Sequence, residues 1–179
     1  PHPDEAARAA LAEALHAPVT TSWGAHGALP ENHPLAVPMY ATETLSEARA
    51  GAELVLVVGS RLGETDWWGK APHWAREQAV IQVDLDDEIL GLNKAVTQAV
   101  LADAGCFLRA LAAELAARPP AEERLAARRA RMEVLRASLA SKRAELDTAL
   151  ANDSAPMHSS RVPDALRRVL DDDAVLVID

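Results

Sequence analysis

A chain of 179 residues is long enough for one sizeable domain, or one domain with an appendage, and for burying roughly 70% of its unfolded surface. Its 18 lysines and arginines stand against 27 acidic residues, a formal net charge of −9 without a basic run, which disfavours nucleic acid or an anionic membrane as a partner. Cys106 is the only cysteine, so a disulfide framework and a multi-cysteine metal site are excluded and a reducing, cytoplasmic location is predicted.

The two ends of the sequence indicate a piece of a longer polypeptide. The first residues, Pro1-His2-Pro3-Asp4-Glu5, contain no initiator methionine and lack the charged and then apolar layout of a signal peptide. No apolar stretch approaches the roughly 20 residues that a membrane helix needs. The sequence stops at Asp179, directly after a strand-like run, and we therefore expect further chain beyond it.

Helical and strand patterns alternate over the first two thirds of the chain. Residues 4–16 place Leu11 and Leu15 at helical spacing, and the run Leu54–Val58 is continuously apolar, as in parallel strands covered on both faces. The predicted elements, in chain order, are a helix at 4–16, a strand at 18–21, a helix at 43–50, strands at 54–58 and 80–83, a helical turn opened by residues 86–88, a strand at 99–101 and a helix at 104–118. This alternation predicts an α/β fold, a Rossmann-like parallel sheet with helices on both faces.

A different pattern follows the helix-breaking pair Pro119-Pro120. Apolar residues recur there every seven positions, at Leu125, Met132, Leu139 and Leu146. This spacing predicts one long amphipathic helix, and because charged residues stand near the seam we favour packing on its own domain over the alternative of a coiled coil. After a linker at 152–156, residues 161–170 are predicted as a helix and 174–178 as a strand. The predicted boundaries are 1–118, 119–153 and 154–179.

Two predicted strands end in residues that suit a nucleotide. In open α/β sheets the ligand crevice lies outside the carboxyl ends of the strands. Gly59-Ser60-Arg61 follows one strand and Asp84 ends the next. A glycine lets a phosphate or ring approach the backbone, an arginine can meet a phosphate or a flavin edge, and a carboxylate at a strand tip can accept both ribose hydroxyls. The neighbouring acids are interpreted as helix caps: Asp86, Asp87 and Glu88.

Other chemistries have little support in the sequence. The six histidines show no metal-ligand spacing, and no Gly-x-Ser-x-Gly elbow, dinucleotide fingerprint or Walker phosphate loop occurs. The segment Gly24-Ala25-His26-Gly27 is at most a relative of a phosphate loop, with ordinary turn glycines as the alternative. Trp67-Trp68 is interpreted as packing a loop or an interface.

Several segments, taken in order, resemble a known family. They are PVTT at 18–21, GALPENHPL at 27–35, LVLVVGSR at 54–61, IQVDLD at 81–86, LADA at 101–104, RV at 161–162 and VLVID at 175–179. Together they resemble the middle domain of the acetolactate synthase-like thiamine-diphosphate enzymes, which also include oxalyl-CoA decarboxylase, followed by the start of that family's carboxy-terminal cofactor domain. The resemblance covers most of the chain.

The resemblance implies a parent enzyme that is a thiamine-diphosphate-dependent lyase or transferase, a carboligase or decarboxylase acting on 2-keto acids or related acyl compounds. It implies thiamine diphosphate and Mg²⁺ bound outside this chain, and a homodimer or homotetramer. Residues 1–118 correspond to the family's six-stranded middle domain without its first strand, 119–153 to a helix and linker, and 154–179 to the truncated start of the cofactor domain. That middle domain binds FAD in acetolactate synthases, ADP in oxalyl-CoA decarboxylases and neither in some members.

Carried over by position, eight residues fall where the family contacts its nucleotide: Ser22, Trp23, Gly24, Gly59, Ser60, Arg61, Asp84 and Asp103. The chain differs from acetolactate synthases at Met39-Tyr40-Ala41-Thr42, where those enzymes carry Gly-x-His-Gly. It differs again at Gly63 and Thr65, where an acidic and a basic residue are usual.

No catalytic residue is expected within the chain, because the family's activating glutamate and its diphosphate motif lie in the other domains. The chain alone is therefore predicted to be inactive, with the role of holding the subunit together and seating a nucleotide. A stand-alone nucleotide-binding module, resembling an electron-transfer flavoprotein domain, and an interaction domain with a vestigial pocket are the alternatives. We further expect 174–178 to fill the place of the first strand, in the same chain or by exchange between two copies.

Overall fold

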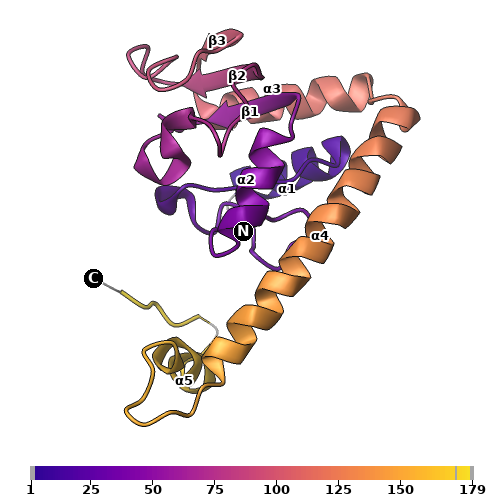
Figure 1. Cartoon of the computed structure of the whole chain (residues 1–179). Coiled ribbons are helices and arrows are strands. Elements are labelled where there is room, and N and C mark those ends of the chain that lie inside the picture. The colour runs from indigo at the N-terminus through magenta and orange to yellow at the C-terminus, as the bar shows by residue number, and fades with distance from the viewer. Residues whose placement is uncertain (1–2, 172, 178–179) are drawn as a thin grey trace. The chain divides into compact units, whose positions relative to one another are not determined.

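The computed structural model describes residues 3–171 and 173–177 (Figure 1). Two compact units, Pro1–Ala137 and Ser138–Asp179, divide the chain. The elements are α1 (Pro3–Leu15), the 3₁₀ turn η1 (Trp23–Ala25), α2 (Thr42–Ala50), β1 (Leu54–Val58), the 3₁₀ segment η2 (Glu64–Gly69), β2 (Ala79–Asp84), β3 (Gln98–Leu101), α3 (Ala104–Ala117), α4 (Glu122–Leu150) and α5 (Arg161–Val169).

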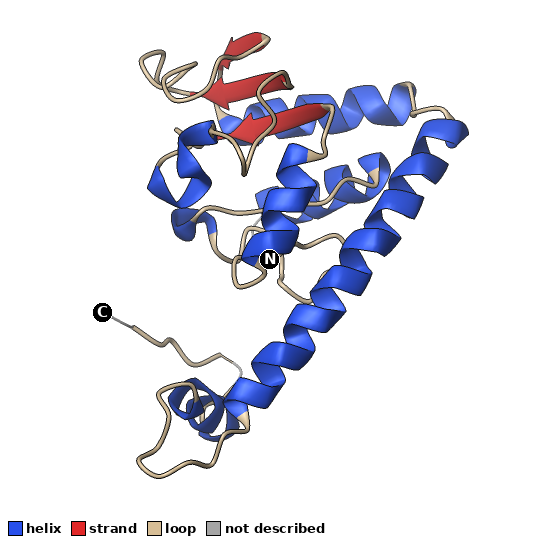
Figure 2. Ribbon diagram, in the orientation of Figure 1, coloured by secondary structure: helices blue, strands red, loops and turns tan. Residues whose placement is uncertain are grey.

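A three-stranded parallel sheet, ordered β1-β2-β3, organises the first unit (Figure 2). In its register Val58 pairs with Val83 and Asp84 with Leu101, so the carboxyl ends of the three strands share one edge. α3 contacts β2, and α1 packs on α3. The predicted α/β class, the parallel sheet and the long helix are confirmed. Three strands are described here, against the six that the resemblance implies for the family.

The core forms where the sheet meets the connection between β1 and β2. Val57, Leu62, Trp74 and Val80 make one buried cluster. The connection contains η2 and turns in place of an α-helix, so its apolar side chains, rather than a helix face, cover this part of the sheet.

The amino-terminal half of α4 packs on the first unit. Met132 and Leu135 are completely buried, and the Arg128 guanidinium donates through Nη1 to the carbonyl of Leu15 at 2.8 Å. Arg131 forms an ion pair of 3.0 Å with Glu47 of α2. The expectation that this helix packs on its own domain is confirmed for this half.

The second unit contains the end of α4 and the short helix α5. Arg161 joins them, because its Nη1 donates to the carbonyl of Leu150 at 3.0 Å and pairs with Asp164 at 3.1 Å. The Ser160 hydroxyl donates to the carbonyl of Ala149 at 2.7 Å. These contacts turn the chain back after the linker at 152–156.

Three predicted elements differ in the structure. The strand expected at 18–21 is one isolated parallel bridge between Val19 and Ala36. The helical turn expected after Asp86 is a run of hydrogen-bonded turns. The strand expected at 174–178 is absent over 174–177, and Ile178 lies outside the described residues.

The missing strand at 174–177 has a physical reason. Val175 is 89% and Val177 88% exposed, so these apolar side chains have no layer to bury them. A strand also needs a neighbouring backbone to satisfy its N–H and C=O groups. The described sheet, ordered β1-β2-β3, does not include this segment. Pairing of 174–177 with this sheet within the same chain is therefore not found, and exchange between two copies stays a prediction.

The start of α3 gives a test of the fold. The Asp103 carboxylate accepts the N–H of Cys106 at 2.8 Å, and this bond holds the pKa of Asp103 below its ordinary value. We expect Asp103→Ala to lower the urea midpoint at pH 7, and Asp103→Asn, which keeps a capping oxygen, to retain most of it.

The sign of the pH dependence follows from the lowered pKa. The contribution of the Asp103 charge is present above the unfolded pKa of about 3.9 and is lost as the pH falls through the lower folded pKa. Because a protonated Asp103 keeps a capping oxygen, as Asn does, the urea midpoints of the wild-type chain and Asp103→Ala should move closer together in strong acid without becoming equal. A difference that is as large in strong acid as at pH 7 would contradict the capping role of this charge.

Candidate functional site

The predicted edge of the sheet brings the ends of the three strands together. The Gly59 N–H donates to the carbonyl of Val83 at 2.9 Å, and the Ala102 N–H donates to the carbonyl of Asp84 at 2.9 Å. Gly59 has φ of +63°, in the left-handed region that favours glycine, and a Cβ placed there would meet nothing within 4 Å. The backbone at the end of β1 is therefore open to a ligand.

The turn that carries Ser60 and Arg61 is fixed from β2 and from the loop after it. Gln82, which is 2% exposed, donates through Nε2 to the carbonyl of Ser60 at 2.9 Å. Its Oε1 accepts the N–H of Gly91 at 2.8 Å, so one buried amide joins the loops that follow β1 and β2. The Asn93 amide donates to the carbonyl of Arg61 at 2.8 Å, and the Arg61 side chain is exposed.

The acids after β2 organise their own loop. Asp84 accepts the N–H of Asp86 through Oδ1 at 3.1 Å. Asp86 in turn accepts the N–H of Glu88 through Oδ1 at 3.0 Å. These are side-chain turns of the kind that aspartate forms outside helices, which explains why this segment does not begin an α-helix. One carboxylate oxygen of Asp84 is engaged in this way.

The other predicted site residues lie in two different settings. Asp103 follows β3 at the same edge of the sheet, but its carboxylate caps α3. Ser22, Trp23 and Gly24 lie in and beside η1, where their contacts are local: the Ala25 N–H donates to the carbonyl of Ser22 at 3.0 Å, and the Trp23 ring tilts against His26 at 5.5 Å. Trp23 is 67% exposed. Their predicted role at the nucleotide stays a prediction.

The residues at the sheet edge fit parts of a nucleotide. Open backbone at Gly59 suits the approach of a phosphate, and an exposed guanidinium at Arg61 suits its charge. The half-buried Asp84 carboxylate suits ribose hydroxyls. The donor and acceptor set therefore fits a ribose and a phosphate.

A buried ion pair, which the sequence analysis did not identify, supports the loop after β1. The Nη2 of Arg49 on α2 donates to Oδ1 of Asp66 at 2.7 Å, and the two side chains are 4% and 6% exposed. The Arg49 guanidinium lies 5.6 Å from the centroid of Trp67 and 5.2 Å from that of Trp74. Burial lowers the pKa of Arg49 and raises the pKa of Asp66, and the charge of each partner opposes the shift of the other.

A serine of α2, Ser46, contacts His73 of the same loop, a pairing that could in principle serve as nucleophile and base. The Ser46 Oγ lies 2.7 Å from Nδ1 of His73 and also donates to the carbonyl of Thr42 at 2.9 Å. Since a hydroxyl has one hydrogen, His73 then donates from Nδ1 to Ser46, the reverse of what a general base does. The His73 ring stacks on Trp67 at 4.0 Å. The predicted packing role of the tryptophan pair is confirmed for Trp67.

Metal and membrane sites find no support in the described part of the chain. No group of three or more His, Cys, Asp or Glu residues there is arranged to hold a metal ion. None of the described helices combines the length and apolar character that a bilayer crossing requires.

The buried pair predicts a large and specific loss of stability. Arg49→Met leaves the Asp66 carboxylate buried without its partner, and we expect it to lower the free energy of unfolding by about 3–5 kcal/mol in a denaturant titration. The matched control is Arg143→Met in the exposed pair with Asp147 (58% and 55% exposed), which should cost less than about 1 kcal/mol. The double variant Arg49→Met/Asp66→Leu should be more stable than Arg49→Met. Equal losses for Arg49→Met and Arg143→Met would be incompatible with this assignment.

Comparisons with known proteins identify a matching family and several similar proteins. Residues 4–111 match the family described as "Thiamine pyrophosphate enzyme, central domain". The chain is 35% identical over 149 residues to a sulfoacetaldehyde acetyltransferase from Rhodobacter capsulatus, covering 77% of this chain and 24% of that protein. It is 32% identical over 110 residues to a probable acetolactate synthase large subunit from Methanocaldococcus jannaschii, covering 60% and 18%.

A 2-hydroxyacyl-CoA lyase from Saccharomyces cerevisiae is 36% identical over 94 residues, covering 51% of this chain and 16% of that protein. The chain thus spans about a quarter or less of the length of these curated relatives.

Proposed function

Because the chain belongs to the thiamine pyrophosphate enzymes, whose central domain its residues 4–111 match, we propose that it is part of a carboligase or decarboxylase acting on 2-keto acids or related acyl compounds. The observation that carries this proposal is that match, together with relatives named as an acetyltransferase, an acetolactate synthase and a lyase. Thiamine diphosphate supplies a thiazolium ylid and an electron sink in such reactions. We propose that the cofactor and Mg²⁺ bind outside this chain, in a cytoplasmic homodimer or homotetramer.

Within that enzyme we propose that this chain is structural and seats a nucleotide, FAD or ADP, at the carboxyl ends of β1 and β2. Gly59 would let a phosphate approach the backbone, Arg61 would meet its charge and Asp84 would accept ribose hydroxyls. Gln82 supports this role because it fixes the Ser60 carbonyl and thereby the path of the turn. Ser22, Trp23, Gly24, Ser60 and Asp103 are proposed contacts on the resemblance alone.

An activity assay tests the enzymatic part of the proposal. The full-length parent protein, with thiamine diphosphate and Mg²⁺, should consume pyruvate in a cofactor-dependent manner, with sulfoacetaldehyde, named by a relative, as a second substrate to be tried. The 179-residue chain under the same conditions should give no turnover. Turnover by this chain alone would refute its structural role, and a parent without thiamine-dependent activity on any 2-keto acid or acyl substrate would refute the proposal.

Calorimetric titration with ADP and with FAD tests the proposed nucleotide-binding site at the carboxyl ends of β1 and β2. Saturable binding is expected for one of them, and Arg61→Met should weaken it about tenfold because a charge-assisted contact is lost. Asp84→Asn should weaken it as well, while Arg118→Met, which removes an exposed arginine elsewhere, should leave it unchanged. Flavin absorbance of the bound material separates FAD from ADP. Binding that is insensitive to both Arg61→Met and Asp84→Asn would place the nucleotide elsewhere.

A further inference from the structure

A hollow of about 410 Å³ lies between two loops of the first unit, the segment before β2 and the segment before β3. Its polar lining consists of Lys70, Arg76, Asn93 and Lys94. None of the residues predicted to contact a nucleotide lines it. Its volume falls in the range of about 300–1,000 Å³ that is usual for small-molecule pockets, but it is broadly open to solvent.

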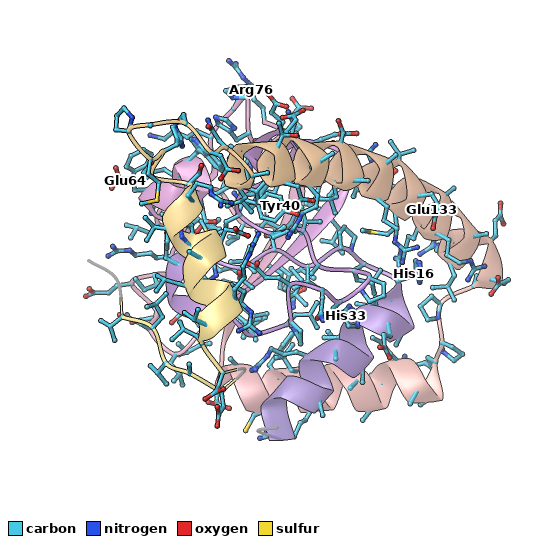
Figure 3. All side chains as sticks on the ribbon, turned by 90° about the horizontal axis from the view of Figure 1, so that it is seen from below. His16, His33, Tyr40, Glu64, Arg76 and Glu133 are labelled. Atoms are coloured by element: carbon cyan, nitrogen blue, oxygen red, sulfur yellow. The ribbon has the colours of Figure 1, made fainter. Side chains whose placement is uncertain are left out.

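The charge of this hollow is opposite to that of the chain. Three of its lining side chains are cationic and none is acidic, in a chain with a formal net charge of −9. Within the described residues, Lys70, Arg76 and Lys94 form no ion pair with a carboxylate. Lys70 and Arg76 are exposed, and Arg76 projects outward at the periphery of the molecule (Figure 3). Three cationic side chains thus line one hollow, and no ion pair among the described residues neutralises them.

Two of the lining side chains, Lys94 and Asn93, are held by hydrogen bonds to backbone carbonyls. Nζ of Lys94 donates to the carbonyl of Ala75 at 2.9 Å and to that of Gly69 at 3.3 Å, and it lies 5.5 Å from the centroid of the buried Trp74 ring. Gly69 has φ of +64°, and a Cβ there would lie 2.7 Å from Cβ of Lys94, so a glycine is required at this approach. Asn93 is fixed by its bond to the carbonyl of Arg61.

This fixation leaves a donor for a ligand. An ammonium group has three N–H donors, and two of those of Lys94 go to carbonyls. Burial also lowers the pKa of Lys94, which a bound anion would offset. Lys70 and Arg76 line the rim of the same hollow and add two further charges there.

We propose that this hollow binds a small phosphomonoester, whose phosphate is held by Lys94, Lys70 and Arg76. The choice of a phosphate rests on the three cations and the absence of an acidic lining residue. The absence of an aromatic lining residue argues against a nucleobase. The volume leaves room for a small organic group beyond the phosphate. This phosphomonoester site is separate from the proposed nucleotide-binding site and shares none of its residues.

Calorimetric titration of the chain with glycerol 3-phosphate tests this site. Saturable binding is expected in the wild-type chain, and the double variant Lys70→Gln/Arg76→Gln should weaken it at least tenfold, since two charge-assisted contacts are lost. Both residues are exposed, so the fold should survive, and unchanged circular dichroism verifies this. The matched control is Arg118→Gln/Arg124→Gln, which removes the same charge from exposed positions on other elements and should leave the affinity unchanged.

Two further variants separate this site from the others. Lys94→Met should abolish binding, and its fold is verified in the same way. Arg61→Met should leave glycerol 3-phosphate binding unchanged while it weakens nucleotide binding, so failure of one proposal is distinguishable from failure of the other. No saturation up to roughly 10 mM ligand, or an equal loss in the Arg118→Gln/Arg124→Gln control, would overturn the inference.

Discussion

The buried pair of Arg49 and Asp66 is the contact on which the irregular half of the fold depends. The connection from β1 to β2 lacks an α-helix and places Trp67 and Trp68 at φ of +49° and +48°, where non-glycine residues are strained by roughly 1–3 kcal/mol each. Asp66 lies immediately before them and is held by the Arg49 guanidinium and, through its carbonyl, by the Trp74 indole at 2.8 Å. Trp74 faces Arg49 on α2 and also Lys94 before β3. The Trp74 ring therefore links α2 to the connection between β1 and β2 and to the segment before β3.

Most regular elements could be predicted from the sequence, because apolar runs and helical spacing report burial directly. The runs that became β1, β2 and β3 and the heptad pattern of α4 are examples. Apolar runs predicted strands wrongly where no neighbouring strand is present to pair with them. The run at 174–177 stays exposed, and the segment 18–21 forms a bridge at one residue only. The ion pair was not predictable from spacing, because its residues are 17 positions apart on different elements. The helical spacing did indicate that Arg49 is buried, because it follows Leu45 by four residues and so lies on the same buried face of α2.

The candidate site was predicted in part. Gly59 and Asp84 lie at the shared edge because parallel strands in register end together. The functions of individual acids could not be separated, since a carboxylate after a strand can bind a ligand, cap a helix or close a turn. Asp103 caps and Asp84 closes a turn with one oxygen. Gln82 was missed because it stands within an apolar run, and the basic hollow was missed because Lys70, Arg76 and Lys94 are scattered in sequence.

The amide of Gln82 has a consequence for how this protein can change over time. Its two ends satisfy the Ser60 carbonyl and the Gly91 N–H, so an insertion that displaces either of these groups would leave one end of the buried amide without a partner. Such an orphaned buried group costs about 1–3 kcal/mol. The two loops are therefore expected to diversify together in evolution, and an engineer who transplants one of them into another protein has to transplant the other with it.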